Sequence, residues 1–276
     1  MTVLLTGATG FIGRHVMRLL LEQGHQVRAV VRDVTACALP PHANLRLLGG
    51  GLSGSAVEDV RGCDALIHLA AHGVLSGMND WSACFRVNVT ESLALWLRCV
   101  DAGVRRFVIC GSCFEYGKSG ERYEFIPVNA PLEPTGAYHA SKAAATMAAQ
   151  ALAVDKNVGI AVLRPFHVFG EGEAPNRFWP SLRGAALRGV DFPMTSGLQV
   201  RDFVPVGQVA EAFVRMASGE DLLRGRAVLH NIGTGRPQTL LSFAQEWWAK
   251  FGASGRLQPG SVAARPNEVM RYVPEI

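Results

Sequence analysis

A glycine-rich turn at the start of the chain strongly restricts the folds that the rest of it can adopt. The apolar run Val3–Leu5 leads directly into Thr6–Gly13 (TGATGFIG), and a helix with one apolar stripe follows. Glycines at positions 7, 10 and 13 allow a tight turn and let the backbone approach a pyrophosphate, which the helix N-terminus stabilises. The turn predicts a dinucleotide-binding strand–turn–helix unit, although its spacing is one residue longer than in the common Gly-x-Gly-x-x-Gly fingerprint.

Further apolar runs alternate with helical segments along the first 165 residues. The expected strands are Val27–Val31, Ala65–Leu69, Phe107–Cys110 and Gly159–Leu163, and the expected helices are Trp81–Val100 and one within Pro134–Ala153. Strands that are apolar throughout and alternate with helices indicate a parallel sheet covered on both faces. The predicted fold class is therefore α/β, a doubly wound parallel sheet of the Rossmann type with a smaller C-terminal substrate-binding domain.

The composition of the sequence changes near residue 166, where prolines and glycines become frequent and the expected alternation of strands and helices stops. We expect residues 1–165 to form the dinucleotide-binding domain and residues 166–276 to form the substrate-binding domain. Some strands of the second part are expected to return to the first domain. A further helix is expected at Leu240–Phe251.

The spacing of Tyr138 and Lys142 places a phenol beside an ammonium group that can lower its pKa. Both lie in the run GAYHASK (136–142), and residues four apart share a helix face. A phenol loses its proton at about pH 10, and an ammonium one turn away favours the phenolate. We therefore expect the pKa of Tyr138 to be moved toward neutrality, as in general acid–base catalysis. The alternative is that the pair is only part of a solvated helix face.

Composition excludes several classes of function. The net charge of +4 comes from scattered residues, and no basic arm indicates nucleic-acid binding. The N-terminus does not resemble a signal peptide, and no window has the ~20 apolar residues that span a bilayer. The six cysteines lack metal-like spacing with histidine, so we expect free thiols in a reducing cytoplasm and no metal site.

The residue after the second strand indicates which cofactor is used. An acidic residue there holds the ribose hydroxyl of NAD, whereas an arginine accommodates the 2′-phosphate of NADP. Arg32 follows Val31 at this place, so we favour NADP(H) over NAD(H). The alternative is that Arg32 is a surface residue and Asp33 contacts the ribose.

Motifs along nearly the whole chain resemble those of the extended short-chain dehydrogenase/reductase family, the NAD-dependent epimerases and dehydratases. The matching segments are Thr6–Gly13, His68–Ala71, Asn88 in RVNVT, Tyr138-x-x-x-Lys142, Arg164–Gly170, Gln199–Phe203 and Asn231–Gly235. The resemblance implies a nucleotide-diphosphate sugar as substrate.

The resemblance also implies roles for individual residues. Ser112, four places before Tyr116-Gly117, would stabilise the reacting oxygen together with the catalytic residues Tyr138 and Lys142. The implied cofactor-binding residues are Gly7, Thr9, Gly10, Phe11, Ile12, Gly13, Arg32, Leu69, Ala70, Ala71, Asn88, Lys142, Phe166, His167 and Val168. The implied substrate-binding residues are Asn176, Arg177, Arg201 and Arg265. His167 replaces a common asparagine, and Gly51 lies where an aspartate often contacts adenine.

Several reactions of this family compete. The predicted function is NADPH-dependent reduction of the 4-keto group of a nucleotide-linked 4-keto-6-deoxyhexose, because Arg32 fits a cofactor that is renewed in every turnover. The ending RPNEVM (265–270) also resembles CDP-sugar 4-ketoreductases such as the paratose and abequose synthases. The alternative is an NAD-dependent nucleotide-sugar 4-epimerase. Dehydratases normally carry Asp-Glu after the serine or threonine, where this chain has Cys113-Phe114.

A non-catalytic cofactor-binding protein is a further alternative, since the fold alone does not determine function. Such a protein has little reason to keep Ser112, Tyr138 and Lys142 together. The helix around Ala140–Ala149 is rich in small side chains, and the resemblance implies a homodimer built from this helix and the one that carries Asn88. Intramolecular packing would account for the small side chains equally well.

Overall fold

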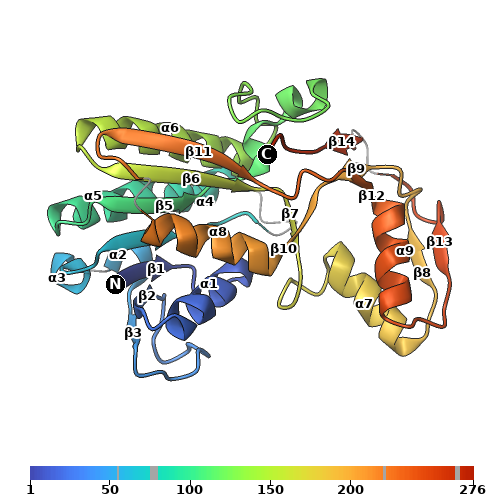
Figure 1. Ribbon diagram of the computed structural model, residues 1–276, viewed down its shortest axis with the longest axis horizontal. Coiled ribbons are helices and arrows are strands. Elements are labelled where there is room, and N and C mark those ends of the chain that lie inside the picture. The colour runs from blue at the N-terminus through green and yellow to red at the C-terminus, as the bar shows by residue number, and fades with distance from the viewer. Residues whose placement is uncertain (55, 75–79, 220–221, 265–267) are drawn as a thin grey trace.

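A seven-stranded parallel sheet forms the centre of the protein (Figure 1). The computed structural model describes residues 1–54, 56–74, 80–219, 222–264 and 268–276. The sheet order is β11-β6-β5-β4-β1-β2-β3, and every neighbouring pair runs parallel. In chain order the strands are β1 (Thr2–Thr6), β2 (Gln26–Val30), β3 (Leu45–Leu48), β4 (Ala65–His68), β5 (Arg106–Cys110), β6 (Gly159–Pro165) and β11 (Arg226–Ile232).

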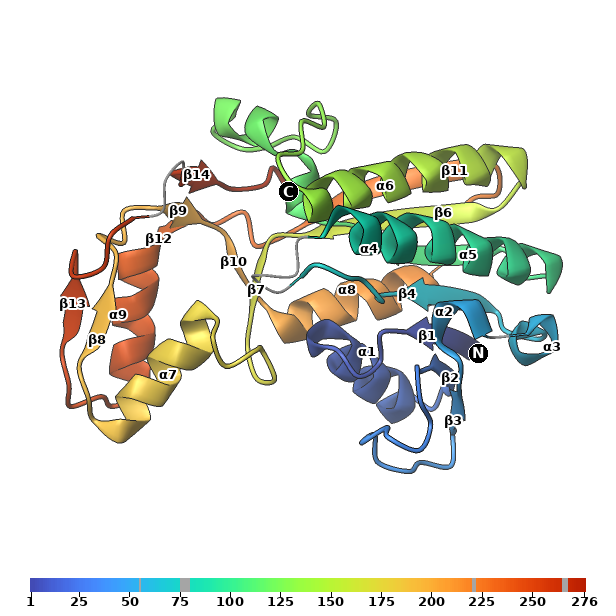
Figure 2. The same cartoon turned by 180° about the vertical axis from the view of Figure 1, so that it is seen from behind.

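Helices cover both faces of this sheet, as Figure 2 shows from behind. Two lie on one face, α1 (Phe11–Glu22) and α8 (Val206–Ser218), and pack on a core that includes Leu5 and Phe213. The other face carries α4 (Trp81–Phe85), η1 (Arg86–Glu91), α5 (Ser92–Asp101) and α6 (Ala137–Asp155), over a core that includes Trp96 and Phe107. Two short helices, α2 (Gly51–Gly54) and α3 (Val57–Val60), precede β4. The predicted doubly wound α/β fold is confirmed.

The sheet changes its winding direction between β1 and β4. Strands β2 and β3 extend it from β1 in one direction, and β4, β5 and β6 extend it in the other. Ligands of open α/β sheets bind at such a switch point, beyond the carboxyl ends of the strands. The predicted glycine turn leaves β1 at this place.

The helix expected over Trp81–Val100 is interrupted by a π-helical segment. Residues 86–91, including Asn88, form η1 between α4 and α5. Segments of this kind are rare and are frequently found at functional sites. The spacing of apolar residues could not reveal η1, because this segment inserts only one wider turn into a continuous helical pattern.

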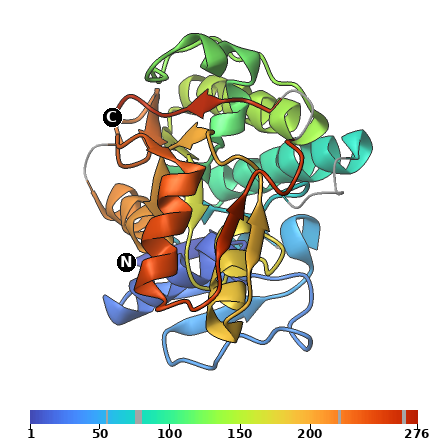
Figure 3. The same ribbon diagram turned by 90° about the vertical axis from the view of Figure 1, so that its right-hand side faces the viewer.

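A smaller lobe forms from most of the chain after residue 166 (Figure 3). Its helices α7 (Phe178–Arg188) and α9 (Leu240–Lys250) enclose a core that includes Leu182 and Trp248. Its short strands are β7 (His167–Phe169), β8 (Phe192–Met194), β9 (Val200–Arg201), β10 (Phe203–Pro205), β12 (Gln238–Thr239), β13 (Leu257–Pro259) and β14 (Arg271–Tyr272). They pair as β10-β7, β12-β9-β14 and β13-β8.

Two elements from the second half of the chain return to the large sheet. Strand β11 pairs with β6 along its whole length, and α8 packs against α1. The division of the chain at residues 165 and 166 stays a prediction. The 3₁₀ helices η2 (Cys113–Glu115) and η3 (Lys118–Arg122) follow β5 along the chain.

Candidate active site

The glycine turn after β1 forms a cradle that side chains would fill. A Cβ atom on Gly13 would lie 1.9 Å from the carbonyl oxygen of Gly7, and one on Gly7 would lie 2.7 Å from the amide nitrogen of Ala70. Gly7 also has a φ of +72°, in the left-handed region that favours glycine. The first turn of α1 carries no acidic residue, and Gly10 gives it no side-chain cap. This open helix N-terminus fits the pyrophosphate of a dinucleotide.

A chain of hydrogen bonds holds the backbone beside this cradle. The hydroxyl of Thr6 accepts from the amides of Leu69 and Ala70, both at 3.1 Å, and lies 3.0 Å from Nδ1 of His68. Nε2 of His68 lies 3.0 Å from the hydroxyl of Ser92, which donates to a backbone carbonyl. The bonds therefore assign a proton to Nε2 and leave Nδ1 as acceptor. Burial lowers the pKa of His68 to about 3, with a smaller contribution from Lys142, so the ring is neutral.

Asn88 connects the loop after β4 to helix α6. Its amide accepts from the nitrogen of His72 at 2.7 Å and donates to the carbonyl of the same residue at 3.0 Å. It also donates to the hydroxyl of Ser141 at 2.9 Å. Ser141 stands next to Lys142, so the predicted cofactor residue Asn88 positions two of the surrounding segments.

The second strand ends at a surface suited to a phosphate. Arg32 is exposed, and a Cβ on Gly51 would lie 3.7 Å from its Cγ. Asp33 uses Oδ1 to accept from the amide and hydroxyl of Thr35, and these bonds lower the pKa of its carboxyl. The carboxylate therefore caps its own turn, which disfavours the alternative that Asp33 contacts the ribose.

Ser112, Tyr138 and Lys142 converge beyond the carboxyl end of β5. Ser112 and Lys142 are 6% and 4% exposed. The Ser112 side chain hydrogen-bonds to the phenol of Tyr138, and the Lys142 ammonium donates to the carbonyl of Cys110. Burial raises the pKa of Tyr138 above its ordinary value, and the bond from Ser112 opposes this rise. The expected movement toward neutrality is wrong for this arrangement, because desolvation of the buried phenol outweighs the hydrogen bond from Ser112.

Glu115 is turned away from the site into a buried network. Its side chain is fully buried, and it forms an ion pair with Arg164 at 2.9 Å. Its Oε1 accepts from the backbone amide of Ser112 at 2.8 Å, while the Ser112 hydroxyl accepts from Phe114 at 3.3 Å. This is the capping box that the pattern Ser-x-x-Glu predicts, and sequence reasoning missed it.

Phe114 faces outward in the place that Glu115 leaves. Its ring stacks on His139 with centroids 4.9 Å apart and lies edge-on to His167 at 6.1 Å. The ring is 38% exposed. A partly exposed aromatic surface therefore borders the candidate catalytic residues, with the rings of His139 and His167 beside it.

The predicted substrate-binding residues are only partly brought together. Burial lowers the pKa of His167 to about 3, and the nearby charges of Arg201 and Arg177 contribute in the same direction. The Arg201 side chain is 12% exposed and donates to the carbonyl of Val269 at 2.6 Å. Asn176 and Arg177 are exposed. The predicted substrate residue Arg265 lies outside the described residues.

Phe166 and Val168 contribute their side chains to packing. Phe166 is 4% exposed and lies between the rings of Tyr116 and Tyr272. Val168 packs at the edge of the core under α8. These two side chains are engaged in packing, so their predicted role toward a cofactor stays a proposal.

Cys110 and Cys113 form a Cys-x-x-Cys run that the sequence analysis overlooked. The intervening Ser112 has an extended backbone, with φ −158° and ψ 140°. Burial raises the pKa of both thiols, that of Cys113 to about 12. Both are free, and such protonated thiols are poor nucleophiles. The described residues contain no group of three or more His, Cys, Asp or Glu side chains that could hold a metal.

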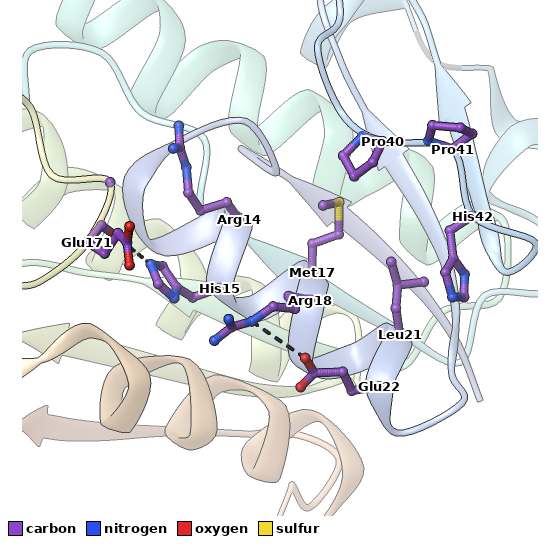
Figure 4. A pocket seen from close by; sticks show the side chains of 11 residues that line it. Arg14, His15, Met17, Arg18, Leu21, Glu22, Pro40, Pro41, His42 and Glu171 are labelled. Carbon is purple, nitrogen blue, oxygen red and sulfur yellow. Dashed lines mark hydrogen bonds and ion pairs between the residues drawn. The ribbon is translucent and has the colours of Figure 1, made fainter.

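A groove of about 560 Å³ lies on the outer side of α1, away from the residues above (Figure 4). Met17 and Leu21 line it from the helix, and Pro40 and Pro41 face them from the loop after β2. None of Ser112, Tyr138 or Lys142 borders it. No helix in the described ranges combines the length and apolar character that a membrane crossing requires.

Comparisons with known proteins agree with this geometry. The sequence profile of the NAD dependent epimerase/dehydratase family matches residues 3–233. A UDP-glucose 4-epimerase from Neisseria meningitidis serogroup C is 27% identical, over 95% of this chain and 85% of that protein. A dTDP-6-deoxy-L-talose 4-dehydrogenase (NAD(+)) from Aggregatibacter actinomycetemcomitans is 26% identical, over 91% and 90%. The structure of MoeE5 in complex with UDP-glucuronic acid and NAD is 31% identical, with a TM-score of 0.85, over 100% of this chain and 90% of that one.

Proposed function

Because the chain belongs to the NAD dependent epimerase/dehydratase family, we propose that it transfers hydride at the C4 carbon of a nucleotide-diphosphate sugar. The observation that carries the proposal is the convergence of Ser112, Tyr138 and Lys142 at the carboxyl edge of the sheet. Lys142 also acts electrostatically on His68, which hydrogen-bonds to Thr6 beside the glycine cradle. The candidate acid–base residues and the candidate cofactor cradle are therefore neighbours.

The chain's own residues perform binding, orientation and proton transfer. Gly7, Gly10 and Gly13 would hold a nicotinamide cofactor, which would supply or accept the hydride. Tyr138 transfers the proton at the C4 oxygen, and Ser112 hydrogen-bonds to the same oxygen as its charge changes. A donor placed in this way contributes up to about 10²–10³ in rate. Lys142 supplies the positive charge that favours the phenolate.

The nearby charges of Arg177 and Arg201 suit a diphosphate. Guanidinium groups bind phosphate oxygens through paired hydrogen bonds. Arg201 is largely buried and points two of its donors at backbone carbonyls, which fixes its direction. Asn176 and Arg265 are proposed as further substrate contacts on the strength of the family resemblance.

We assign 4-epimerisation as the reaction that the comparisons support best. UDP-glucose 4-epimerases recur among the relatives, and MoeE5 binds UDP-glucuronic acid and NAD. An epimerase oxidises C4 and returns the hydride to the opposite face, so it needs the same serine, tyrosine and lysine. This assignment replaces the 4-ketoreductase as the leading hypothesis.

The 4-ketoreductase is a second candidate because of Arg32. Its guanidinium is exposed beside Gly51 and suits the 2′-phosphate of NADP, and one relative acts as a 4-dehydrogenase on a 6-deoxy sugar. NADP(H) preference and a role in deoxysugar synthesis depend on this candidate. Dehydration is disfavoured, because Phe114 replaces a carboxylate at the site and Glu115 is paired with Arg164.

We also propose a homodimer through the helices opposite α1 and α8. Trp81 and Phe85 of α4 are 59% and 36% exposed and stack on each other, and Met147 and Val154 of α6 are 64% and 70% exposed. Covering such side chains favours association. Light scattering of the purified protein measures its mass directly, and a monomer at micromolar concentration would contradict this part. No disulfide joins any of the six cysteines, all of which lie in the described residues, and this is consistent with the predicted cytoplasmic location.

One experiment separates the two reactions. The protein is incubated with UDP-glucose or UDP-glucuronic acid and NAD, and separately with NADPH and nucleotide-linked 4-keto-6-deoxy sugars. A C4 epimer seen by NMR without net change in NADH absorbance supports epimerisation. Stoichiometric loss of NADPH absorbance supports the reductase. Absence of both reactions across UDP-, dTDP-, CDP- and GDP-linked sugars would contradict the proposal.

A further inference from the structure

We propose that Glu115 is a positioning residue, which uses Thr146 to fix Ser112 against the catalytic face of α6. The inference rests on the proposed function, because it assigns Glu115 a task only if Ser112 and Tyr138 act on the same oxygen. Beyond the proposed function, we assign the distance between Ser112 and Tyr138 to a buried carboxylate that does not itself react.

The two oxygens of Glu115 bind opposite sides of the site. Oε1 accepts from the backbone amide of Ser112 at 2.8 Å, and Oε2 accepts from the hydroxyl of Thr146 at 2.8 Å. Glu115 is fully buried and Thr146 is 1% exposed. Hydrogen bonds to an ionised group in a dry environment are short and strong, so this bridge is stiff.

Thr146 belongs to the same helix face as the catalytic residues. Tyr138, Lys142 and Thr146 follow one another at intervals of four in α6. Residues with this spacing lie above one another on the helix surface. The bridge through Glu115 therefore sets the distance and angle between the serine loop and the whole Tyr138–Lys142 face.

Arg164 keeps the bridging group charged and in place. Its Nε donates to Oε2 of Glu115 at 2.9 Å, and its Nη1 donates to the hydroxyl of Tyr116 and the carbonyl of Val128, both at 3.0 Å. Burial raises the pKa of Glu115, and the charge of Arg164 opposes that rise. An ion pair satisfied in this way holds one geometry, whereas removal of either partner leaves a buried charge unpaired.

The orientation of the loop assigns different tasks to neighbouring residues. Glu115 points into the protein, and Phe114 is 38% exposed beside the candidate catalytic residues. The Glu115 carboxylate accepts hydrogen bonds from Ser112, Thr146 and Arg164, so its oxygens are engaged inside the protein. Glu115 therefore acts on the reaction through Ser112 and does not touch the substrate.

Thr146 is the best position for a test. Glu115→Gln leaves Arg164 unpaired and can prevent folding, whereas Thr146→Val removes one hydroxyl and keeps the shape and the ion pair. Thr146→Ser restores the hydroxyl. Ser119→Ala is the matched control, because Ser119 is fully buried and its hydroxyl donates to the carbonyl of Pro131 without contact to Glu115.

The expected result is a loss in kcat that only Thr146→Val shows. Both Thr146→Val and Ser119→Ala should lower Tm by about 2–4 °C, as the loss of one buried hydrogen bond does in a protein of this size. Thr146→Val should also lower kcat about tenfold with an unchanged KM for the nucleotide sugar, and Thr146→Ser should recover most of it. Wild-type kcat in Thr146→Val, or equal losses in Thr146→Ser or Ser119→Ala, would overturn the inference.

A second measurement does not depend on turnover. The ¹⁵N–¹H signal of the Ser112 amide reports the hydrogen bond to Glu115. It should shift in Thr146→Val and stay in place in Ser119→Ala; an unchanged signal in both variants contradicts the positioning role. A wild-type protein without turnover on any nucleotide sugar would refute the proposed function instead, and the amide signal would still decide whether Thr146 positions Ser112.

Discussion

The ammonium of Lys142 donates a hydrogen bond to the backbone carbonyl of Cys110. Lys142 lies one helical turn after Tyr138 in α6. This bond fixes the charge at the end of β5, where Ser112 also reaches the phenol. Burial nevertheless dominates the environment of Tyr138 and raises its pKa. The raised pKa of Tyr138 gives the proposed reaction a pH dependence of known direction.

Sugar oxidation should become faster as the pH rises. In the oxidation direction Tyr138 accepts a proton, so the phenolate is the active form. Because the pKa of Tyr138 is raised, the phenolate forms only at alkaline pH. The initial rate of NAD reduction should therefore still be increasing at pH 9. Keto reduction uses the protonated phenol and should be nearly constant between pH 6 and 9. An oxidation rate that levels off below pH 8 contradicts this expectation.

Replacing Tyr138 by Phe should lower kcat by about 10²–10⁴, because the phenol is the proposed proton carrier. The ring stays, so circular dichroism and Tm should change little. Ser112→Ala should cost about 10²-fold through loss of the bond to the reacting oxygen. Tyr123→Phe removes a different phenol and serves as control. Near-normal turnover of Tyr138→Phe would contradict the proposed mechanism.

Reversing the charge at residue 32 tests the choice of cofactor. Arg32→Asp should weaken binding of NADPH at least tenfold more than that of NADH, because an aspartate repels the 2′-phosphate and can accept from a ribose hydroxyl. Binding is followed by fluorescence titration of both cofactors. Arg224→Asp carries the same charge change near the amino end of β11 and should leave the ratio unaltered. An unchanged ratio in Arg32→Asp argues against NADP preference.

A methyl group at the glycine cradle should abolish cofactor binding. Gly13→Ala places a Cβ 1.9 Å from the carbonyl oxygen of Gly7, so the turn has to move. Gly207→Ala in α8 meets nothing within 4 Å and should be neutral or slightly stabilising. Calorimetric titration with NAD and NADP measures both variants. Wild-type affinity in Gly13→Ala would show that the turn does not bind the cofactor.

Glu173 should make the protein less stable as the pH rises. Burial raises the pKa of its carboxyl to about 7, although Arg177 lies 3.5 Å away. The folded protein therefore favours the protonated carboxyl of Glu173. This contribution to the free energy of unfolding is fully present below pH 4.5 and is lost as the pH rises through about 7. Glu173→Gln should therefore be more stable than the wild type at pH 8, by about 1 kcal/mol after screening by solvent, and nearly equal at pH 4. Parallel denaturation curves across this pH range would contradict the assignment.

Local patterns were sufficient to predict the parts of the fold that depend on neighbouring residues. The glycine spacing at 7, 10 and 13 predicts the cradle, because it reflects a steric limit within one turn. The apolar runs predict β1, β2, β4 and β5 within one residue of their observed bounds, and β6 within two. The short strand β3 was missed, since Leu45–Leu48 contains only four residues and one exposed arginine.

The environment of the candidate site could not be read from spacing. The direction in which burial moves the pKa of Tyr138 depends on everything packed around the phenol. The Cys110–Cys113 spacing resembles a redox motif, but only the structure shows that Cys110 ends β5, that Cys113 begins η2 and that both thiols are protonated in the protein interior. Arg32 and Gly51 meet because β2 and the segment after β3 end at the same sheet edge.

The sequence by itself determined the dinucleotide fold and the Tyr138–Lys142 pair, because tight turns and helix faces depend on residues a few places apart. Only the tertiary structure decided that Glu115 points inward and Phe114 outward. That choice depends on Arg164 and Thr146, which lie 49 and 31 residues away along the chain. A buried carboxylate must find its donors wherever the packed chain supplies them, so its orientation is a property of the whole fold.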